Sequence, residues 1–210
     1  ETIYVSNEKD HNISVIDGDS LEVIKTVKVG HRPRGIILSK DKKKIIICTS
    51  DDNRIAVVDV ASLEVEYYLP SGPDPELMVM DDAGKFIYVA NEDDNMVTVV
   101  DYIEKKVVKE IPVGVEPEGM GLSPDGKTLV NTSETTNMAH FIDTSTLEIK
   151  ANVLVDARPR VAQYTSDGKF VWVSSEIGGT ISIIDPVKFE IIKKIEFNIP
   201  GLSKESVQPV

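Results

Sequence analysis

Charged residues flank a proline at four places in the sequence, and these places are 42 residues apart. The motifs are Arg32-Pro33-Arg34, Asp74-Pro75-Glu76, Glu116-Pro117-Glu118 and Arg158-Pro159-Arg160. Guanidinium groups and carboxylates gathered on one surface can grip a polar or zwitterionic ligand, or a partner of mixed charge. The alternative is that neighbouring motifs neutralise each other in ordinary ion pairs. Because proline favours an extended preceding residue, we expect the flanking side chains to splay apart.

A second candidate group lies between residues 131 and 140. Asn131 stands where Val89 and Val173 stand 42 residues away, and His140 likewise replaces small residues. An unpaired buried polar group costs about 1–3 kcal/mol, so each side chain either has a partner or faces a ligand. One interpretation is a satisfied structural pair. The other is a ligand or haem contact that, with Glu134, serves a lactonase-like hydrolase or a cofactor-dependent oxidoreductase.

The elements that position these residues repeat along the whole chain. An aspartate closes each of five short apolar runs at intervals of 42 residues: Asp17, Asp59, Asp101, Asp143 and Asp185. Runs rich in Val, Ile and Tyr, separated by turn signals roughly every 8–12 residues, predict a four-stranded antiparallel meander, with strands A to D. In the third repeat we expect these strands at about 77–80, 86–90, 96–100 and 107–111.

Such repeats predict an all-β fold, a β-propeller of four-stranded antiparallel blades with a 42-residue repeat. A β-solenoid is the alternative, but its coils are shorter. We expect one domain over 1–210, with a partial blade at 1–30, blades at 31–72, 73–114, 115–156 and 157–198, and the start of another at 199–210. Because an open ring leaves apolar blade faces in water, we expect about five of seven blades; a closed five-bladed ring is the alternative.

The meander places the candidate residues on one side of the propeller. The D-to-A and B-to-C loops share one face, which we call the D–A/B–C face, and it carries the charged proline motifs and the loop with Glu134. The Asp-Gly-Lys hairpins and the Asp17-type turns lie on the opposite face, where we expect a structural role. The run Glu92-Asp93-Asp94 lacks the spacing of a calcium loop, and a single histidine cannot build a metal site, so we predict no metal.

Composition limits the partners. The chain has 23 basic and 35 acidic residues and a net charge of −12, which disfavours nucleic acid and anionic membranes. No apolar run approaches the roughly 18 residues of a membrane helix, so we expect no membrane span. The single cysteine, Cys48, excludes an intrachain disulfide and a cysteine-based metal cluster, and it fills a slot for small residues. No Ser/His/Asp order or phosphate loop stands out, so the enzyme signal is weak.

Several segments resemble the YVTN-type β-propeller repeat, a group related to the haem domain of cytochrome nitrite reductase. These segments are Ile3-Tyr4-Val5-Ser6-Asn7, Ile87-Tyr88-Val89-Ala90-Asn91 and Ser123-Pro124-Asp125-Gly126-Lys127. The charged proline motifs and residues 131–140 are similar to one branch, the β-propeller protein associated with pyrroloquinoline-quinone (PQQ)-dependent alcohol catabolism. That resemblance implies a periplasmic, seven-bladed, non-catalytic protein that acts beside a quinoprotein dehydrogenase or its cytochrome.

The resemblance implies no bound cofactor, and PQQ and haem enter only by association. Quinoprotein dehydrogenases carry a recurring tryptophan after a Gly-rich turn, whereas here only Trp172 has that place. We therefore do not expect this chain to be the quinone-binding enzyme. Because YVTN-type repeats also occur in surface-layer proteins, a structural array at the cell surface is a further alternative.

Overall fold

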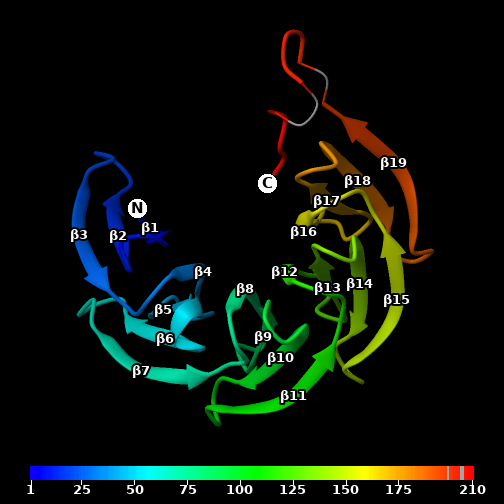
Figure 1. Cartoon of the computed structure of the whole chain (residues 1–210). Helices are drawn as coiled ribbons and strands as arrows, with labels where there is room; N and C mark the ends of the chain where they lie inside the picture. The colour runs from blue at the N-terminus through cyan, green and yellow to red at the C-terminus, as the bar shows by residue number, and fades with distance from the viewer. Residues whose placement is uncertain (198, 204–205) are drawn as a thin grey trace. The chain divides into compact units, whose positions relative to one another are not determined.

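The fold is described from a computed structural model, which describes residues 1–197, 199–203 and 206–210. In these residues the chain forms 19 strands, arranged as one three-stranded and four four-stranded sheets (Figure 1). Each sheet is a meander of consecutive strands, which confirms the all-β prediction. Among the described residues, no helix has the length and apolar character needed to cross a lipid bilayer.

The sheets are called blades 1 to 5 in chain order. Blade 1 contains β1 (Thr2–Asn7), β2 (Asn12–Asp17) and β3 (Val23–Lys28). Blade 2 contains β4 (Pro33–Leu38), β5 (Lys44–Thr49), β6 (Arg54–Asp59) and β7 (Val65–Pro70). Blade 3 contains β8 (Pro75–Met80), β9 (Phe86–Asn91), β10 (Met96–Asp101) and β11 (Lys106–Pro112). Blade 4 contains β12 (Pro117–Leu122), β13 (Thr128–Ser133), β14 (Met138–Asp143) and β15 (Glu148–Leu154). Blade 5 contains β16 (Pro159–Tyr164), β17 (Val171–Ser175), β18 (Thr180–Asp185) and β19 (Glu190–Glu196).

Blade 3 confirms the strands expected for the third repeat, with one difference at its start. Strand β8 begins at Pro75, because a register shift between Pro75 and Met78 lets the proline open the strand. Proline tolerates this place because it has no N–H to give to the ladder. In the segment 199–210, the described residues 199–203 and 206–210 form no strand, and Asn198 lies outside the described residues. That 199–210 starts a further blade stays a prediction.

The chain divides into two compact units. The first unit contains Glu1–Asp94 and Thr98–Lys109, and the second contains Asn95–Val97 and Glu110–Val210. The expectation of one domain over the whole chain stays a prediction.

In the first unit, the second strand of a blade is apolar on both sides because it packs on two neighbours. Ile45 and Ile47 of β5 belong to a cluster with Ile13 and Val15 of blade 1. The alternate residues, Ile46 and Cys48, belong to a cluster with blade 3. Burial raises the pKa of the Cys48 thiol well above its ordinary value, which keeps the group protonated and unreactive.

In the second unit, the core lies between blades 4 and 5. Phe141 of β14 is fully buried, and its ring meets Phe189 edge to face, with 5.1 Å between the centroids. Gly119 of β12 lets β12 and β16, the first strands of blades 4 and 5, lie close together, since a Cβ there would lie 2.2 Å from the carbonyl oxygen of Arg160. A side chain at this position would push the two blades apart.

The turns between strands C and D repeat one hydrogen-bond pattern. In the first, Asp17 Oδ1 accepts the N–H groups of Asp19 and Ser20, at 3.0 and 2.8 Å. The same pattern recurs at the aspartates 42 residues apart, namely Asp59, Asp101, Asp143 and Asp185. The structural role predicted for these aspartates is confirmed, because a side-chain carboxylate that caps its own turn stabilises it.

A second repeated hydrogen bond joins each blade to the loop that enters the next one. A residue in the B-to-C turn, with φ between 53° and 61°, accepts the N–H of the residue before the next motif proline. The pairs, at 3.0–3.1 Å, are His11 with Arg32, Asn53 with Asp74, Asn95 with Glu116, and Asn137 with Arg158. These bonds position the charged motifs relative to the preceding blade.

We expect Phe141→Ala to lower the free energy of unfolding by about 3–5 kcal/mol, because it empties a site in the core of blades 4 and 5. The measurement is urea unfolding of the full chain. Ile103→Ala, which truncates an exposed apolar residue in a C-to-D turn, is the control and changes the free energy by no more than about 0.5 kcal/mol. Equal effects of the two changes would contradict the inter-blade core.

Candidate functional site

The residue before each motif proline has a left-handed backbone. The φ angles are 49° for Arg32, 49° for Asp74, 58° for Glu116 and 58° for Arg158. The prediction of an extended residue with splayed side chains is therefore wrong. The physical reason is the loop hydrogen bond from the preceding blade, which holds the N–H of this residue and outweighs the ordinary preference before proline.

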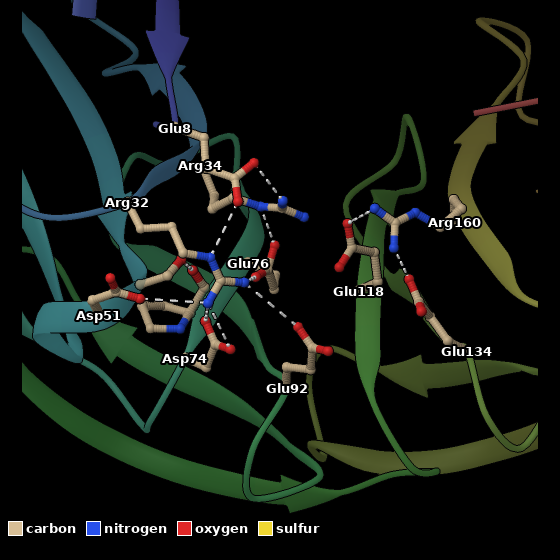
Figure 2. A network of polar contacts seen from close by, with 12 residues as sticks. Glu8, Arg32, Arg34, Asp51, Asp74, Glu76, Glu92, Glu118, Glu134 and Arg160 are labelled. Carbon is tan, nitrogen blue, oxygen red and sulfur yellow. Dashed lines mark hydrogen bonds and ion pairs between the residues drawn. The ribbon is translucent and has the colours of Figure 1, made fainter. Parts of the chain in front are cut away.

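In the first unit, the two arginines of blade 2 converge on one buried carboxylate (Figure 2). Arg34 Nε donates to Glu76 Oε2 at 2.5 Å, and Arg32 Nη2 donates to Glu76 Oε1 at 2.8 Å. Arg32 Nη1 also donates to both oxygens of Asp74, at 3.0 and 3.1 Å. Both arginines further pair with Glu8, at 3.3 and 3.0 Å. The charged side chains around the starts of β4 and β8 therefore form ion pairs with one another.

The burial of Glu76 makes this pairing consequential. Its side chain is 0% exposed, and an isolated carboxylate there would be costly, because burial removes the water that stabilises its charge. Burial alone would lower the pKa of Arg32, but the hydrogen bond and charge of Asp74 and the charge of Glu76 raise it above its ordinary value. Burial also opposes ionisation of Glu8, whereas Arg34 and Arg32 hold its pKa below the ordinary value. Both shifts favour the charged forms of Arg32 and Glu8.

Asp74, Glu76 and Glu92 could hold a metal ion by geometry alone, since one oxygen from each lies within 4.8 Å of the others. Arg32 already pairs with all three: its Nη1 lies 3.0 Å from Asp74, and its Nη2 lies 2.8 Å from Glu76 and 4.0 Å from Glu92. The guanidinium group therefore occupies the place and supplies the charge that a cation would supply.

The second unit has a corresponding cluster between blades 5 and 4. Arg160 pairs with Glu118 at 3.2 Å and, more closely, with Glu134 (Figure 2). It also lies 3.7 Å from Glu176. Arg158 Nε donates to Glu134 at 2.8 Å, and this hydrogen bond raises the pKa of Arg158. Glu118 and Glu134 are each about nineteen-twentieths buried. The remaining motif residue, Glu116, accepts a hydrogen bond from Thr135.

Both clusters follow one rule within their units. Arg34 and Glu76 are 42 residues apart, and so are Glu118 and Arg160, so that equivalent positions of neighbouring blades pair. The change of charge sign from blade to blade thus has a structural use in each unit. Of the two sequence interpretations, the geometry favours mutual neutralisation for these innermost residues.

Asn131 and His140 lie opposite each other in strands β13 and β14, but each has its own partners. Asn131 Nδ2 donates to the carbonyl oxygen of Gly119 at 3.1 Å. His140 Nε2 accepts the N–H of Gly114 at 2.9 Å, which places the ring proton on Nδ1, 2.7 Å from Asn152 Oδ1. Burial lowers the pKa of His140 below its ordinary value, although the bond to Asn152 opposes this. Both ring nitrogens are therefore engaged by the fold.

Two kinds of residue in this region were missed by the sequence reasoning. The first kind is the B-to-C turn residue that accepts the N–H before each motif proline. These residues are spaced 42 apart, so the sequence could have predicted a common role for them: His11, Asn53, Asn95 and Asn137. Asn152, the partner of His140, has no such signal, because the equivalent residues are Tyr68, Glu110 and Lys194. Only the register between β14 and β15 brings it to the histidine.

Comparisons with known proteins agree with this architecture. A family model described as the cytochrome D1 heme domain matches residues 45–163, which is more than half of the chain. Among solved structures, the chain is similar to the hydrazine synthase of Kuenenia stuttgartiensis, with 24% sequence identity and a TM-score of 0.81. The match covers 88% of this chain and 59% of that chain, so this chain spans less than two thirds of that protein's length. A search of curated proteins gives no match. The family and the fold likeness confirm the β-propeller.

We expect Arg160→Met to lower the free energy of unfolding by about 3 kcal/mol, because it leaves the buried carboxylate of Glu118 without this cation. The value lies at the low end for a broken buried pair, since Arg158 still pairs with Glu134. Denaturant unfolding measures it. Adding Glu118→Gln should recover part of the loss, because the side chain is then neutral.

The matched control is Lys127→Met, which removes an ion pair of 3.9 Å whose lysine is 80% exposed. It should change the free energy by no more than about 0.5 kcal/mol. A loss for Arg160→Met no larger than that of the control would show that the cluster does not hold the blades together.

The lowered pKa of His140 predicts that the folded chain loses stability as the pH falls. Because its pKa is lower in the folded chain than the ordinary value of 6.5, the unfolded chain binds the proton more readily. Its contribution is complete above about pH 6.5 and is lost as the pH falls towards the folded-state pKa, by up to about 1.4 kcal/mol per pH unit. Unfolding free energies measured between pH 5 and pH 7.5 should show a shallower slope in His140→Gln. An unchanged slope in His140→Gln would contradict the assignment.

Proposed function

The chain belongs to the cytochrome D1 haem domain family, and on this premise we propose that it is part of a non-catalytic periplasmic β-propeller that binds a partner through its D–A/B–C face. The proposed setting is quinoprotein, PQQ-dependent alcohol oxidation. The partner would be a quinoprotein dehydrogenase or its cytochrome, with a small polar ligand as the alternative. The setting rests on the resemblance of the charged proline motifs and residues 131–140 to that branch of propellers.

One observation carries the non-catalytic part of the proposal. The charged or polar groups that sequence reasoning placed at the site are bonded within the fold. Arg34 pairs with Glu76, and Arg160 pairs with Glu118. The ring nitrogens of His140 bond the N–H of Gly114 and the side chain of Asn152. A general base or nucleophile needs a group that is open to a substrate. The enzyme alternative built on Asn131, Glu134 and His140 therefore has no support in this geometry.

The family name implies haem, and the residues of the candidate site do not fit it. Haem iron requires an axial nitrogen, sulfur or oxygen ligand with a lone pair to give. Both nitrogens of His140 are bonded within the fold, and the arginines that would meet haem carboxylates already pair with Glu76, Glu118 and Glu134. We therefore propose no haem-dependent reaction at this site.

The surface left for a partner consists of the loops around the paired motifs. Asp51 and Asp93 lie in B-to-C loops of the first unit and are exposed. With a net charge of −12, the chain favours a partner that presents basic groups to these loops. Such contacts mainly govern the association rate and its dependence on salt.

The test is surface plasmon resonance of the full chain against the purified quinoprotein dehydrogenase and its cytochrome. We expect saturable binding that weakens between about 0.05 and 0.5 M salt, because screening shortens the reach of surface charge. Asp93→Lys should weaken binding at low salt about three- to tenfold, as expected for one surface charge at an interface. His140→Gln should leave binding unchanged.

The matched control is Asp19→Lys, which makes the same change of charge in a C-to-D turn on the opposite face. It should have no more than a twofold effect, roughly the long-range part of the electrostatic field. Absence of saturable binding to both proteins would overturn the proposed partner, and equal effects of the two lysine variants would overturn the proposed face.

A further inference from the structure

A cavity of about 280 Å³ lies on the opposite face of the second unit, among the turns of blades 4 and 5. It is called the turn cavity. Its lining includes Pro124 and Asp125 from the A-to-B turn of blade 4, Tyr164 at the end of β16, and Asp167 and Pro186 from the turns of blade 5. It shares no residue with the two arginine–glutamate clusters, and it includes neither of the B-to-C loops that carry Asp51 and Asp93.

The corresponding place between blades 2 and 3 has its own ammonium group. Lys40 crosses the A-to-B turn of blade 3, with its Cγ 3.3 Å from the position of a Cβ on Gly84, and its Nζ lies 2.8 Å from Asp82. In blade 4 the equivalent of Lys40 is Pro124, which covers Gly168 but carries no cation. The position that holds an ammonium group between blades 2 and 3 therefore holds none at the turn cavity, although the partner of Lys40, Asp82, is replaced there by Ser166.

Tyr164 brings an unsatisfied polar group to the turn cavity. Its side chain is 5% exposed, and its hydroxyl has no hydrogen-bond partner among the described residues. The equivalent residues of the other blades are Leu38, Met80 and Leu122, so packing alone does not need a hydroxyl here. Burial raises the pKa of Tyr164, which keeps the group neutral. A buried hydroxyl without a partner costs about 1–3 kcal/mol, and a ligand that bonds it would recover that cost.

The two carboxylates of the turn cavity are ionised at neutral pH. Hydrogen bonds from Thr165 and from the backbone of Lys169 lower the pKa of Asp167 to about 2, and a bond from Ser123 lowers the pKa of Asp125. Their nearest cations, Lys169 and Lys127, lie 3.1 and 3.9 Å away but are largely exposed, so water screens them. The lining of the cavity therefore combines negative charge, a buried hydroxyl without a hydrogen-bond partner among the described residues, and two prolines.

We propose that the turn cavity binds a small organic ammonium ion with an apolar body. The ammonium group faces Asp125 and Asp167 and donates a hydrogen bond to the hydroxyl oxygen of Tyr164, while the apolar body packs against Pro124 and Pro186.

The test is an NMR titration of the full chain with phenethylammonium, compared with 2-phenylethanol, a neutral molecule of similar shape. We expect saturable binding of the amine, and at least tenfold weaker binding of the alcohol. Tyr164→Phe should weaken amine binding about tenfold, the size of one hydrogen bond to a charged donor. Pro124→Lys, which copies the residue of blade 2, should abolish saturable binding because its own ammonium occupies the cavity.

The control is Tyr88→Phe, which removes another buried phenol hydroxyl outside the turn cavity and should leave the affinity unchanged. Tyr164→Leu, which copies blades 2 and 4, checks the result with a residue that those blades accommodate. Equal affinity for amine and alcohol, an unchanged affinity in Tyr164→Phe, or absence of saturation would overturn the proposal. The last result would mean that Tyr164 bonds only water.

Discussion

The structure depends on the burial of carboxylates that only a neighbouring blade can neutralise. Glu76 and Glu118 are the second residues of β8 and β12, the first strands of blades 3 and 4, and are almost inaccessible to water, so each needs a guanidinium group at its side. Arg34 and Arg160 supply it from the equivalent position of the adjacent blade within the same unit. Other repeated features serve this contact: the turn residue that holds the loop N–H, the motif proline, and the glycine that lets innermost strands approach.

This arrangement changes how the D–A/B–C face should be understood. A cluster of arginine and glutamate resembles a ligand site when its residues are seen only as a pattern of charge. Once the carboxylates are buried and the guanidinium groups are bonded, opening the cluster for a ligand would expose unpaired charge in the interior. Recognition on this face therefore falls to the exposed loops around the cluster, where water already solvates the side chains.

The extent to which the sequence predicted the structure differs with the physical origin of each feature. The strands and the Asp17-type turns followed from spacing, because an aspartate that caps its own turn acts locally. The backbone before the motif prolines was mispredicted, because its N–H donates a hydrogen bond to residue 11 or 53, which lies 21 residues earlier and overrides the local preference. The partner of His140 was not predictable from the repeat, because Asn152 occurs in one blade alone and meets it only through strand register.

The opposite signs of the paired motifs, in blades 2 and 3 and again in blades 4 and 5, also bear on how a chain of similar modules finds its correct neighbours. Blades with the same apolar faces can dock on the wrong partner during folding, which is a known failure of repetitive chains. An arginine-bearing blade that met another arginine-bearing blade would bring like charges together, and such repulsion discriminates against wrong neighbours. Within each unit the charged proline motif therefore favours the correct neighbour, because an exchange that brought two arginine motifs together would place like charges side by side.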